Sequence, residues 1–440
     1  MKHPLIKGAL ILTIAGFITR FLGFFYKLIL SRILGPEQLG IYQLIFPVYS
    51  LCYTIYASGM QPAISKAVAP YGSAATKPSK KILTNGCKLS LFIALCCSIV
   101  LYSFSHFIAE VLLKEPRCAS GLQILALVFP FCSISACING YYYGQKQTLH
   151  PSIAQLVEQI TRIAFSMLFV FPILSRFSTF SYTTAIASIV VGELCAMIYN
   201  CIVISCSHPK KDSLHDFSVS SWIISRQLLS HAIPLTASHF VTTLLHSAEA
   251  ILIPNLLLLY GMSQSESLSI YGILTGMTMP ILLFPSTLIH SFTVLLLPSV
   301  SEAHARKKYG YIYKTTCQAC FFSALLGFAF SVFFLLFGPQ IGILLFDNAL
   351  VGSYLQNLAF LCPMLYINHI LTSVLNGLGK TSIIFRNTVL SQLLKIFLLC
   401  ICIKTYGIAG YFFAMLFAQL FSSCLDLFSV LSIKKHRNET

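Results

Sequence analysis

The chain has 440 residues, of which 56% are hydrophobic and only 10% are charged, and its formal net charge is +16. A soluble domain of this size does not have that balance, so the composition excludes a soluble enzyme or binding module. The alternating ten-residue segments that mark an outer-membrane barrel are absent. The fold class that follows is an all-α membrane protein that crosses the membrane many times.

We predict about twelve transmembrane helices from the apolar runs. About 20 residues at ~1.5 Å per residue suffice to cross the hydrocarbon core. The start resembles a signal peptide because Lys2 and Lys7 precede an apolar run. That run is too long and has no small-residue cleavage site, so we expect a retained helix. In chain order the predicted spans are residues 8–33, 40–69, 83–112, 121–143, 152–174, 181–206, 228–259, 268–299, 312–337, 354–377, 383–403 and 407–431.

The first span carries an arginine near its middle, Arg20. An arginine at that depth costs roughly 3 kcal/mol on insertion scales. Residues spaced by three, four and seven share a helix face, which places Thr13, Gly16, Arg20, Gly23 and Lys27 on one seam. Two interpretations follow: a buried arginine paired with a carboxylate on another helix, or a cation that lines an internal cavity.

The connections between spans divide Lys and Arg unequally. One set of alternate connections, with both termini, holds 17 of them, and the other set holds 5. Positive residues concentrate on the cytoplasmic side, so both termini are predicted to be cytoplasmic. This asymmetry accounts for most of the positive charge, and we expect no nucleic-acid partner.

The connection 207–226 is the longest and most polar, and it lies in the middle of the chain. It carries the only tryptophan, Trp222, for which we predict a short interfacial helix. We therefore predict an N-terminal six-helix lobe over residues 1–206, a cytoplasmic linker over 207–226 and a C-terminal six-helix lobe over 227–440.

A weak internal repeat supports two related halves. Asn139-Gly140 corresponds to Asn376-Gly377, and sixteen residues after each asparagine comes Gln-Leu. A second echo pairs LGIY at 39–42 with LSIY at 268–271. An even number of spans per half gives both halves the same orientation, with a substrate site expected between them near the midplane.

Several polar groups lie inside predicted spans. Glu158 and Arg162 are four residues apart and can pair, either as a neutralised structural pair or in a cavity wall. Either Glu193 or Asp426 could be a lone protonated carboxyl or a cation ligand. One face of the seventh span carries His239, Thr242, Thr243, His246 and Glu249, for which lining of a water-filled cavity is favoured over a metal site.

Glu249 falls opposite Arg20 if the halves are aligned through the second echo. Cys317 and Cys320 form a single CxxC with no second ligand pair, so we expect no metal.

The segment AGFITRFLGFFYKLILSRILGPEQLGIYQLIFPVY, residues 15–49, the stretch PAISK at 62–66 and the Asn-Gly repeats resemble a known family. It is the stage V sporulation protein B and polysaccharide-exporter branch of the multidrug/oligosaccharidyl-lipid/polysaccharide exporter (MOP) superfamily, similar to the lipid II flippase MurJ. The resemblance implies two six-helix lobes in a V, as in MATE-like transporters, and export of lipid-linked sugars by alternating access. It places Arg20 at a first-helix cavity arginine. Lys27 stands where flippases often have an acid, and flippases often have fourteen spans.

We therefore expect a flippase, not an enzyme, that moves a polyprenyl-pyrophosphate-linked saccharide across the bacterial cytoplasmic membrane. The partners expected are this lipid-linked oligosaccharide and membrane lipids, the protein is expected to be a monomer, and the only cofactor would be a coupling cation, Na+ or H+. The predicted substrate-binding residues are Arg20, Lys27, Arg162, Glu158, Glu249, His246 and Asn376.

Two alternatives remain open. A cation-coupled multidrug efflux antiporter of the same fold needs a carboxylate in the first-half cavity, which Glu158 or Glu193 can supply. A glycosyl or phosphosugar transferase needs paired carboxylates on a loop. The longest loop offers only Asp212 and Asp216.

Overall fold

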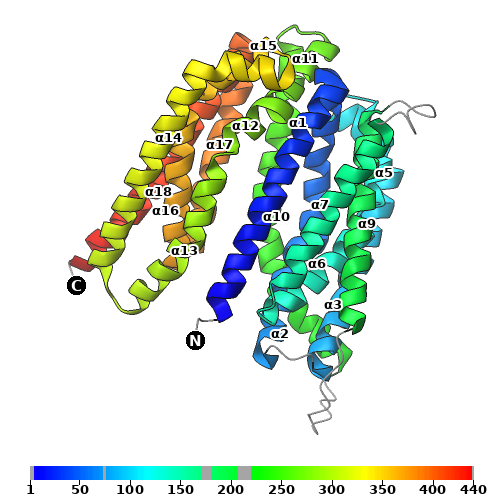
Figure 1. Ribbon diagram of the computed structural model, residues 1–440, viewed down its shortest axis with the longest axis vertical. Helices are drawn as coiled ribbons and strands as arrows, with labels where there is room; N and C mark the ends of the chain where they lie inside the picture. The colour runs from blue at the N-terminus through cyan, green and yellow to red at the C-terminus, as the bar shows by residue number, and fades with distance from the viewer. Residues whose placement is uncertain (1–3, 73–75, 171–179, 207–219, 439–440) are drawn as a thin grey trace. The chain divides into compact units, whose positions relative to one another are not determined.

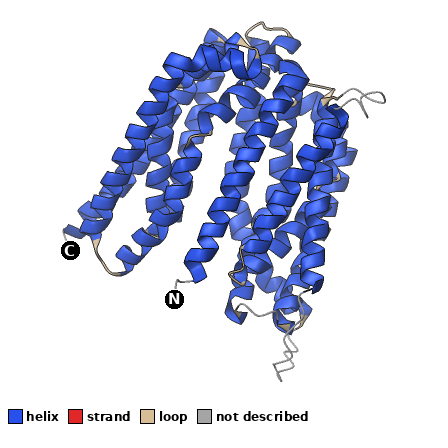
Figure 2. Ribbon diagram, viewed as in Figure 1, coloured by secondary structure: helices blue, strands red, loops and turns tan. Residues whose placement is uncertain are grey.

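The computed structural model describes residues 4–72, 76–170, 180–206 and 220–438. Within these ranges every residue lies in a helix or a loop, and no strand occurs (Figure 2). The predicted all-helical architecture is therefore confirmed for the described part of the chain.

Nine helical elements in the described ranges are long and apolar enough to cross a membrane, and the number rises to eleven if each of two bent helix pairs counts as one span. The first element, Ile14–Tyr71, has 58 residues and includes two of the twelve predicted spans. The helix α1 (Pro4–Tyr53) inside it is interrupted at Gly35, which has φ 72° and ψ 174°. Glycine adopts this conformation without a Cβ clash, and Pro36 then starts the next helical segment.

By contacts between residues, the chain forms two compact units. Unit 1 comprises Met1–Tyr26 and Ile41–Ser247, and unit 2 comprises Lys27–Gly40 and Ala248–Thr440. Thus α1 contributes to both units, and α10 (Ser221–Leu259) passes from unit 1 to unit 2 after Ser247. The lobe limits 1–206 and 227–440 stay a prediction.

The predicted linker lies largely outside the described residues, which omit 207–219. The expectation of a short interfacial helix at Trp222 is wrong, because Trp222 lies in the first turn of the 39-residue helix α10. Its indole is 67% exposed and lies 5.5 Å from the Arg226 guanidinium carbon, measured to the ring centroid. The side chain can still serve as an interfacial anchor at this helix end.

Unit 1 is a helical bundle in which α6 packs against α2, α3 and α9, and α9 packs against α7 (Figure 1). Fully buried members of its core include Tyr56, Phe129, Tyr141 and Tyr142. The helices are α2 (Met60–Val68), α3 (Lys77–Ser103), α4 (Ser105–Phe107), α5 (Cys118–Ala126), α6 (Phe129–Gly144), α7 (Leu149–Val170) and α9 (Tyr182–Cys206), with π-helical turns at Thr54–Ser58 and Ile108–Leu112 and a 3-10 turn at Ala69–Tyr71.

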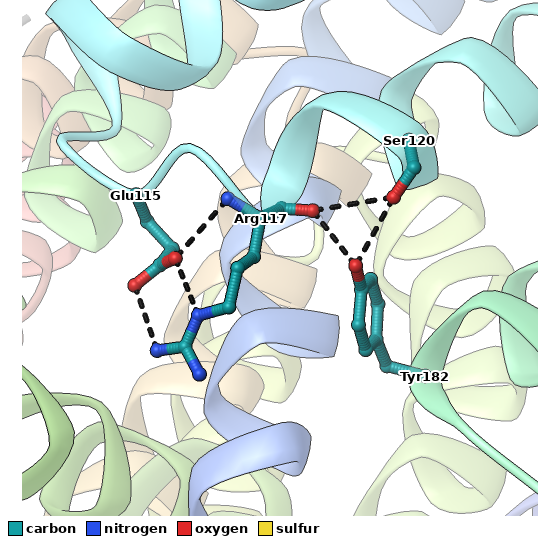
Figure 3. Close-up of polar contacts among 4 residues, drawn as sticks. All are labelled: Glu115, Arg117, Ser120 and Tyr182. Atoms are coloured by element: carbon teal, nitrogen blue, oxygen red, sulfur yellow. Dashed lines mark hydrogen bonds and ion pairs between the residues drawn. The ribbon is translucent and has the colours of Figure 1, made fainter.

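One loop of unit 1 is fixed by a buried carboxylate (Figure 3). Glu115 is 2% exposed and accepts hydrogen bonds from the Arg117 backbone N–H at 3.2 Å, Nε at 2.7 Å and Nη2 at 3.0 Å. The Tyr182 hydroxyl donates to the Arg117 carbonyl at 2.8 Å and lies 3.1 Å from Ser120 Oγ. These bonds tie the start of α5 to the start of α9.

Unit 2 packs α14, α16, α17 and α18 side by side (Figure 1). Tyr366 and Phe334 are its largest fully or almost fully buried side chains. Its helices are α11 (Gln264–Gly272), α12 (Met279–Leu283), α13 (Ser286–Ala305), α14 (Tyr309–Phe346), α15 (Ala349–Leu358), α16 (Leu361–Gly377), α17 (Thr381–Tyr406) and α18 (Ile408–Asn438), with a π-helical segment at Ile273–Thr278.

The two halves of the chain share a bent helix pair and a closely packed glycine. The pair α5 and α6 is bent by 45°, and the corresponding pair α15 and α16 by 55°. A Cβ built on Gly140 would lie 2.5 Å from the Gln61 carbonyl oxygen, and one built on Gly377 would lie 2.9 Å from Val300 Cβ. Both glycines of the predicted Asn-Gly repeat therefore permit close helix packing, which supports an internal duplication.

Candidate functional site

Unit 1 contains a polar cavity of about 160 Å³ between the helices α6, α7 and α9. Its wall holds two carboxylates, Glu158 from α7 and Glu193 from α9. The other lining residues are Tyr53, Gln61, Cys132, Ser135, Ala136, Asn139, Tyr143, Ala154, Gln155, Ala196 and Asn200. The cavity is formed wholly within unit 1, so its lining does not depend on unit 2.

Glu158 and Arg162 pair as the i, i+4 spacing predicts. Arg162 Nη2 donates to Glu158 Oε1, and the two side chains are 19% and 23% exposed, in that order. One carboxylate at the cavity is thus neutralised by its own helix. No salt bridge of Glu193 is recorded within the described part of unit 1, and Arg162, which pairs with Glu158, also interacts electrostatically with Glu193.

Several buried polar atoms around this cavity have no hydrogen-bond partner among the described residues. They are Ser135 Oγ, Asn139 Oδ1 and both amide atoms of Asn200. A buried polar group left unsatisfied costs roughly 1–3 kcal/mol, so such atoms need a ligand or solvent. Together with the two carboxylates they form a set rich in oxygen atoms. Oxygen atoms coordinate hard cations and accept hydrogen bonds from sugar hydroxyl groups.

The first helix is anchored to unit 1 by Tyr26, which lies six residues after Arg20. The Tyr26 hydroxyl lies 2.9 Å from Ser166 Oγ on α7 and 3.1 Å from Ser188 Oγ on α9. Arg20 is exposed, and no ion pair with a carboxylate is recorded for it within the described residues of unit 1. Lys27 is also exposed and lies in the segment of α1 that belongs to unit 2. The structure does not provide Arg20 with the carboxylate that the paired interpretation requires in unit 1.

The predicted stripe on α10 is divided between the units, with His239 to His246 in unit 1 and Glu249 in unit 2. Glu249 is 9% exposed and forms an ion pair with Lys395 of α17, where Nζ lies 2.6 Å from Oε1. The Gln392 amide donates to its other oxygen. His246 is exposed on the preceding turn and belongs to the unit 1 part of α10, and Thr243 Oγ1 accepts a hydrogen bond from Thr54 at 3.2 Å.

The expectation that Arg20 and Glu249 face one cavity concerns both units and stays a prediction. Asn376, the remaining predicted site residue, is exposed in the last turn of α16, where its carbonyl accepts from the Gly379 N–H at 3.0 Å. It lies at a helix end in unit 2, and its role as a site residue stays a prediction.

A carboxylate network in unit 2 was missed as a cluster, although its members stood out singly in the sequence. Asp426 of α18 is 4% exposed and accepts from Asn387 Nδ2 at 2.8 Å and from Thr372 Oγ1 at 3.3 Å. Asn368 Nδ2 donates to Ser422 Oγ at 2.8 Å. The helices α16, α17 and α18 bring these residues together, a meeting that spacing along one helix cannot reveal.

The family model of the polysaccharide biosynthesis protein matches residues 5–304 of the chain. The chain belongs to this family. A second model, MatE, matches residues 252–401. The predicted resemblance is therefore confirmed, and the two matches together cover most of both halves.

The chain is similar in sequence to two proteins of Bacillus subtilis. The chain is 26% identical to stage V sporulation protein B over 400 residues, which covers 90% of the chain and 77% of that protein. It is 25% identical to the lipid II flippase MurJ over 339 residues, which covers 70% of the chain and 60% of the flippase.

Solved structures of transporters share the fold. An inward-facing MATE family multidrug resistance transporter of the MOP superfamily matches with a TM-score of 0.75 at 15% identity, over 95% of this chain and 96% of the other. A MOP superfamily transporter from Pyrococcus furiosus, described by the reverse polarity of its binding pocket, matches with a TM-score of 0.69 at 15% identity, over 99% and 97%. This family member is a multi-pass membrane transporter or flippase of the MOP superfamily.

Proposed function

We propose that this transporter flips a polyprenyl-pyrophosphate-linked saccharide, lipid II or another wall or spore-wall precursor, across the bacterial cytoplasmic membrane. It works by alternating access as a monomer, with both termini in the cytoplasm, and it performs no covalent chemistry. The observation that carries the proposal is the exposed Arg20 on a helix that Tyr26 anchors to α7 and α9. Its guanidinium is thus presented on a fixed element, and no carboxylate in the described part of unit 1 neutralises it.

A pyrophosphate is the ligand that best suits such a guanidinium. Arginine is always charged and donates two parallel hydrogen bonds to one phosphate group. Lys27, seven residues further along α1, is a secondary cation for the same group. Arg162 contributes less than its sequence position predicts, because Glu158 already neutralises it. The sugar occupies polar surroundings while the polyprenyl tail stays in lipid.

The cavity of unit 1 suits a coupling cation, Na+ or H+. Glu158, Glu193, Asn139 and Asn200 supply oxygen atoms there, and the amide atoms of Asn200 lack partners among the described residues. Binding of a cation in this cavity would give the cycle a driving force. A Glu193→Gln variant that binds 22Na+ as tightly as wild type, and that takes up as many protons, would contradict this assignment.

Native mass spectrometry of the purified protein tests the substrate directly. Wild type should carry co-purified polyprenyl-pyrophosphate lipid, and Arg20→Ala should carry at least tenfold less. Arg226→Ala is the matched control, since Arg226 is an exposed arginine beside Trp222 and outside the proposed site. Equal lipid in Arg20→Ala and the control would exclude a substrate role for Arg20.

A second candidate function is a cation-coupled multidrug antiporter of the same fold. The pair of carboxylates in the unit 1 cavity favours it, because an organic cation is attracted to a wall that carries carboxylates. Calorimetry with a panel of organic cations separates the two functions. The flippase proposal expects no binding by wild type, whereas binding abolished by Glu193→Gln would favour the antiporter.

A further inference from the structure

A second polar pocket, of about 210 Å³, lies in unit 2 where α13 ends and α14 begins (Figure 1). Two of its residues, Arg306 and Lys308, are basic, and one, Glu302, is acidic. The other lining residues are Ser299, Ala303 and Tyr311. All six residues belong to unit 2, so the pocket is formed within that unit.

The turn that carries the two basic residues is held by backbone hydrogen bonds. The Lys308 N–H donates to the Ala303 carbonyl at 2.9 Å, and the Lys307 N–H donates to the His304 carbonyl at 3.0 Å. Lys307 has φ 58°, the left-handed conformation that commonly ends a helix with this hydrogen-bond pattern. The backbone of Arg306 and Lys308 is therefore fixed, and only their side chains need to move to meet a ligand.

The charges around the pocket are predominantly positive. Residues 302–314 include one acid, Glu302, and four bases, which gives a net charge of +3. Arg306 Nη2 lies 2.7 Å from Glu302 Oε1, whereas no ion pair of Lys308 is recorded among the described residues. A surface with an excess of positive charge attracts anions. The pocket therefore suits an anionic ligand, to which Lys308 offers an ammonium group and Arg306 a guanidinium.

The first turn of α14 marks the level of the pocket in the membrane. Tyr311 and Tyr313 are 55% and 43% exposed, in that order, and tyrosine is enriched where a membrane meets water. From there α14 continues as one of the helices that are long and apolar enough to cross a membrane. The pocket therefore lies at the level of the lipid head groups.

One exposed face of α14 leads from the pocket into the apolar part of the helix. Residues spaced by three or four lie on the same face of a helix. Starting from the pocket, this spacing is followed by the exposed residues Tyr311, Lys314, Gln318, Phe322 and Leu325. Phe322 is 66% exposed and Leu325 is 59% exposed. A ligand that joins an anionic head group to hydrocarbon chains matches both parts of this surface, whereas a soluble phosphate matches only the pocket.

We propose that the pocket between α13 and α14 binds the head group of an anionic phospholipid. Lys308 and Arg306 bind the phosphate oxygens, and the Tyr311 hydroxyl donates a hydrogen bond to them. The acyl chains lie along Phe322 and Leu325. With the topology proposed above, this lipid belongs to the cytoplasmic leaflet. The lipid is bound and not transported, so the inference goes beyond the substrate proposal and does not require it.

Native mass spectrometry of the full chain in detergent, with added phosphatidylglycerol or phosphatidylcholine, tests the proposal. Wild type should bind phosphatidylglycerol more tightly, because only this lipid carries a net negative charge. Lys308→Gln should weaken that binding about fivefold, the loss expected for one cation at an anionic membrane surface. Glu302→Gln should tighten it, because the acid is removed from the pocket. Phe322→Ala should weaken it without changing the preference for phosphatidylglycerol.

Two double variants that each remove two positive charges provide the matched control. Arg306→Gln/Lys308→Gln changes the pocket, whereas Lys77→Gln/Lys380→Gln changes two exposed lysines beside the starts of α3 and α17 that do not line it. Only the first should lose the preference for phosphatidylglycerol. Both should melt like wild type, because all four side chains are exposed.

Three outcomes overturn the proposal. Phosphatidylcholine that binds wild type as tightly as phosphatidylglycerol would show that the charge of the head group is not recognised. An equal loss of preference in the two double variants would show that overall charge, and not the pocket, attracts the lipid. Displacement of the bound lipid by excess soluble glycerol phosphate would show that the pocket is a site for a free anion.

Discussion

Lys395 of α17 and Glu249 of α10 form a buried ion pair in unit 2, with 2.6 Å between Nζ and Oε1. Gln392 of α17 donates to the second carboxylate oxygen, so both acceptor atoms of Glu249 are occupied. The side chains of Lys395 and Glu249 are only 14% and 11% exposed, in that order. A carboxylate satisfied in this way joins two helices and is a poor ligand for a mobile substrate.

Breaking this pair should destabilise the fold. We expect Lys395→Met to lower the free energy of unfolding by about 3–5 kcal/mol, because Glu249 is left buried and uncompensated. Adding Glu249→Gln to it should recover most of the loss, since no unpaired charge then remains. Thermal melting of the purified protein measures both.

The exposed i, i+4 pair between Arg306 and Glu302 is the control for that experiment. Its two side chains are 63% and 65% exposed, in that order, at an N–O distance of 2.7 Å. Solvent screens such pairs strongly, so Arg306→Ala should leave the melting temperature unchanged. A Lys395→Met variant that melts like wild type would show that the buried pair is not a structural one.

The glycines of the internal repeat should not tolerate a methyl group. Gly140→Ala would bring a Cβ to 2.5 Å from the Gln61 carbonyl oxygen, a backbone atom that cannot rotate away. Overpacking of this kind costs roughly 1–3 kcal/mol, which a lower melting temperature would report. In contrast, Gly16→Ala has nothing within 4 Å of the new atom and should be neutral or stabilising. Equal melting temperatures for the two variants would contradict the close packing of α2 on α6.

Arg20 should be needed for transport but not for folding. We expect Arg20→Ala to express and melt like wild type, since the side chain is exposed and Tyr26 holds the helix. It should fail to complement a flippase-deficient strain, whereas Arg20→Lys should be intermediate because lysine keeps the charge but loses the bidentate geometry. Unfolding of Arg20→Ala, or normal transport by it, would remove Arg20 from the proposed site.

The two ends of α14 should lie on opposite sides of the membrane. Single cysteines near Lys307 and near Asp347, in a background without the sixteen native cysteines, flank this 38-residue helix. Only the site near Asp347 should react with an impermeant reagent added outside. If the reagent reaches both sites from outside, the predicted topology is wrong.

Local features of the fold could be read from the sequence, and long-range ones could not. Glu158 and Arg162 pair as predicted because four residues make one helical turn. The helices α12 and α13 begin beside Pro280 and Pro285, as the preference of proline for the start of a helix would suggest. The start of α10 was missed because no glycine or other breaker separates Trp222 from the apolar run, and Pro234 is accommodated inside the helix.

The polar clusters of unit 2 depend on tertiary structure. Lys395 and Glu249 are each a charged residue within an apolar run, but nothing in either run shows that the other helix lies beside it. The same holds for Asp426 and Asn387. The cavity of unit 1 could be predicted in part. Its carboxylates were recognised singly in the sequence, whereas the amide of Asn200, which lacks a hydrogen-bond partner among the described residues, became apparent only from the structure.

The distance between Glu249 and its partners along the chain has a consequence for biosynthesis. Gln392 is made 143 residues after Glu249, and Lys395 follows three residues later. At 5–20 residues per second, α10 leaves the ribosome roughly 7–30 s before α17 can supply the ammonium group. During that interval a membrane-inserted α10 carries a carboxyl group that lacks its partner, at a cost of roughly 3 kcal/mol at bilayer depth. Stalling synthesis before residue 392 should therefore leave α10 weakly inserted and open to proteolysis or to binding by an insertase.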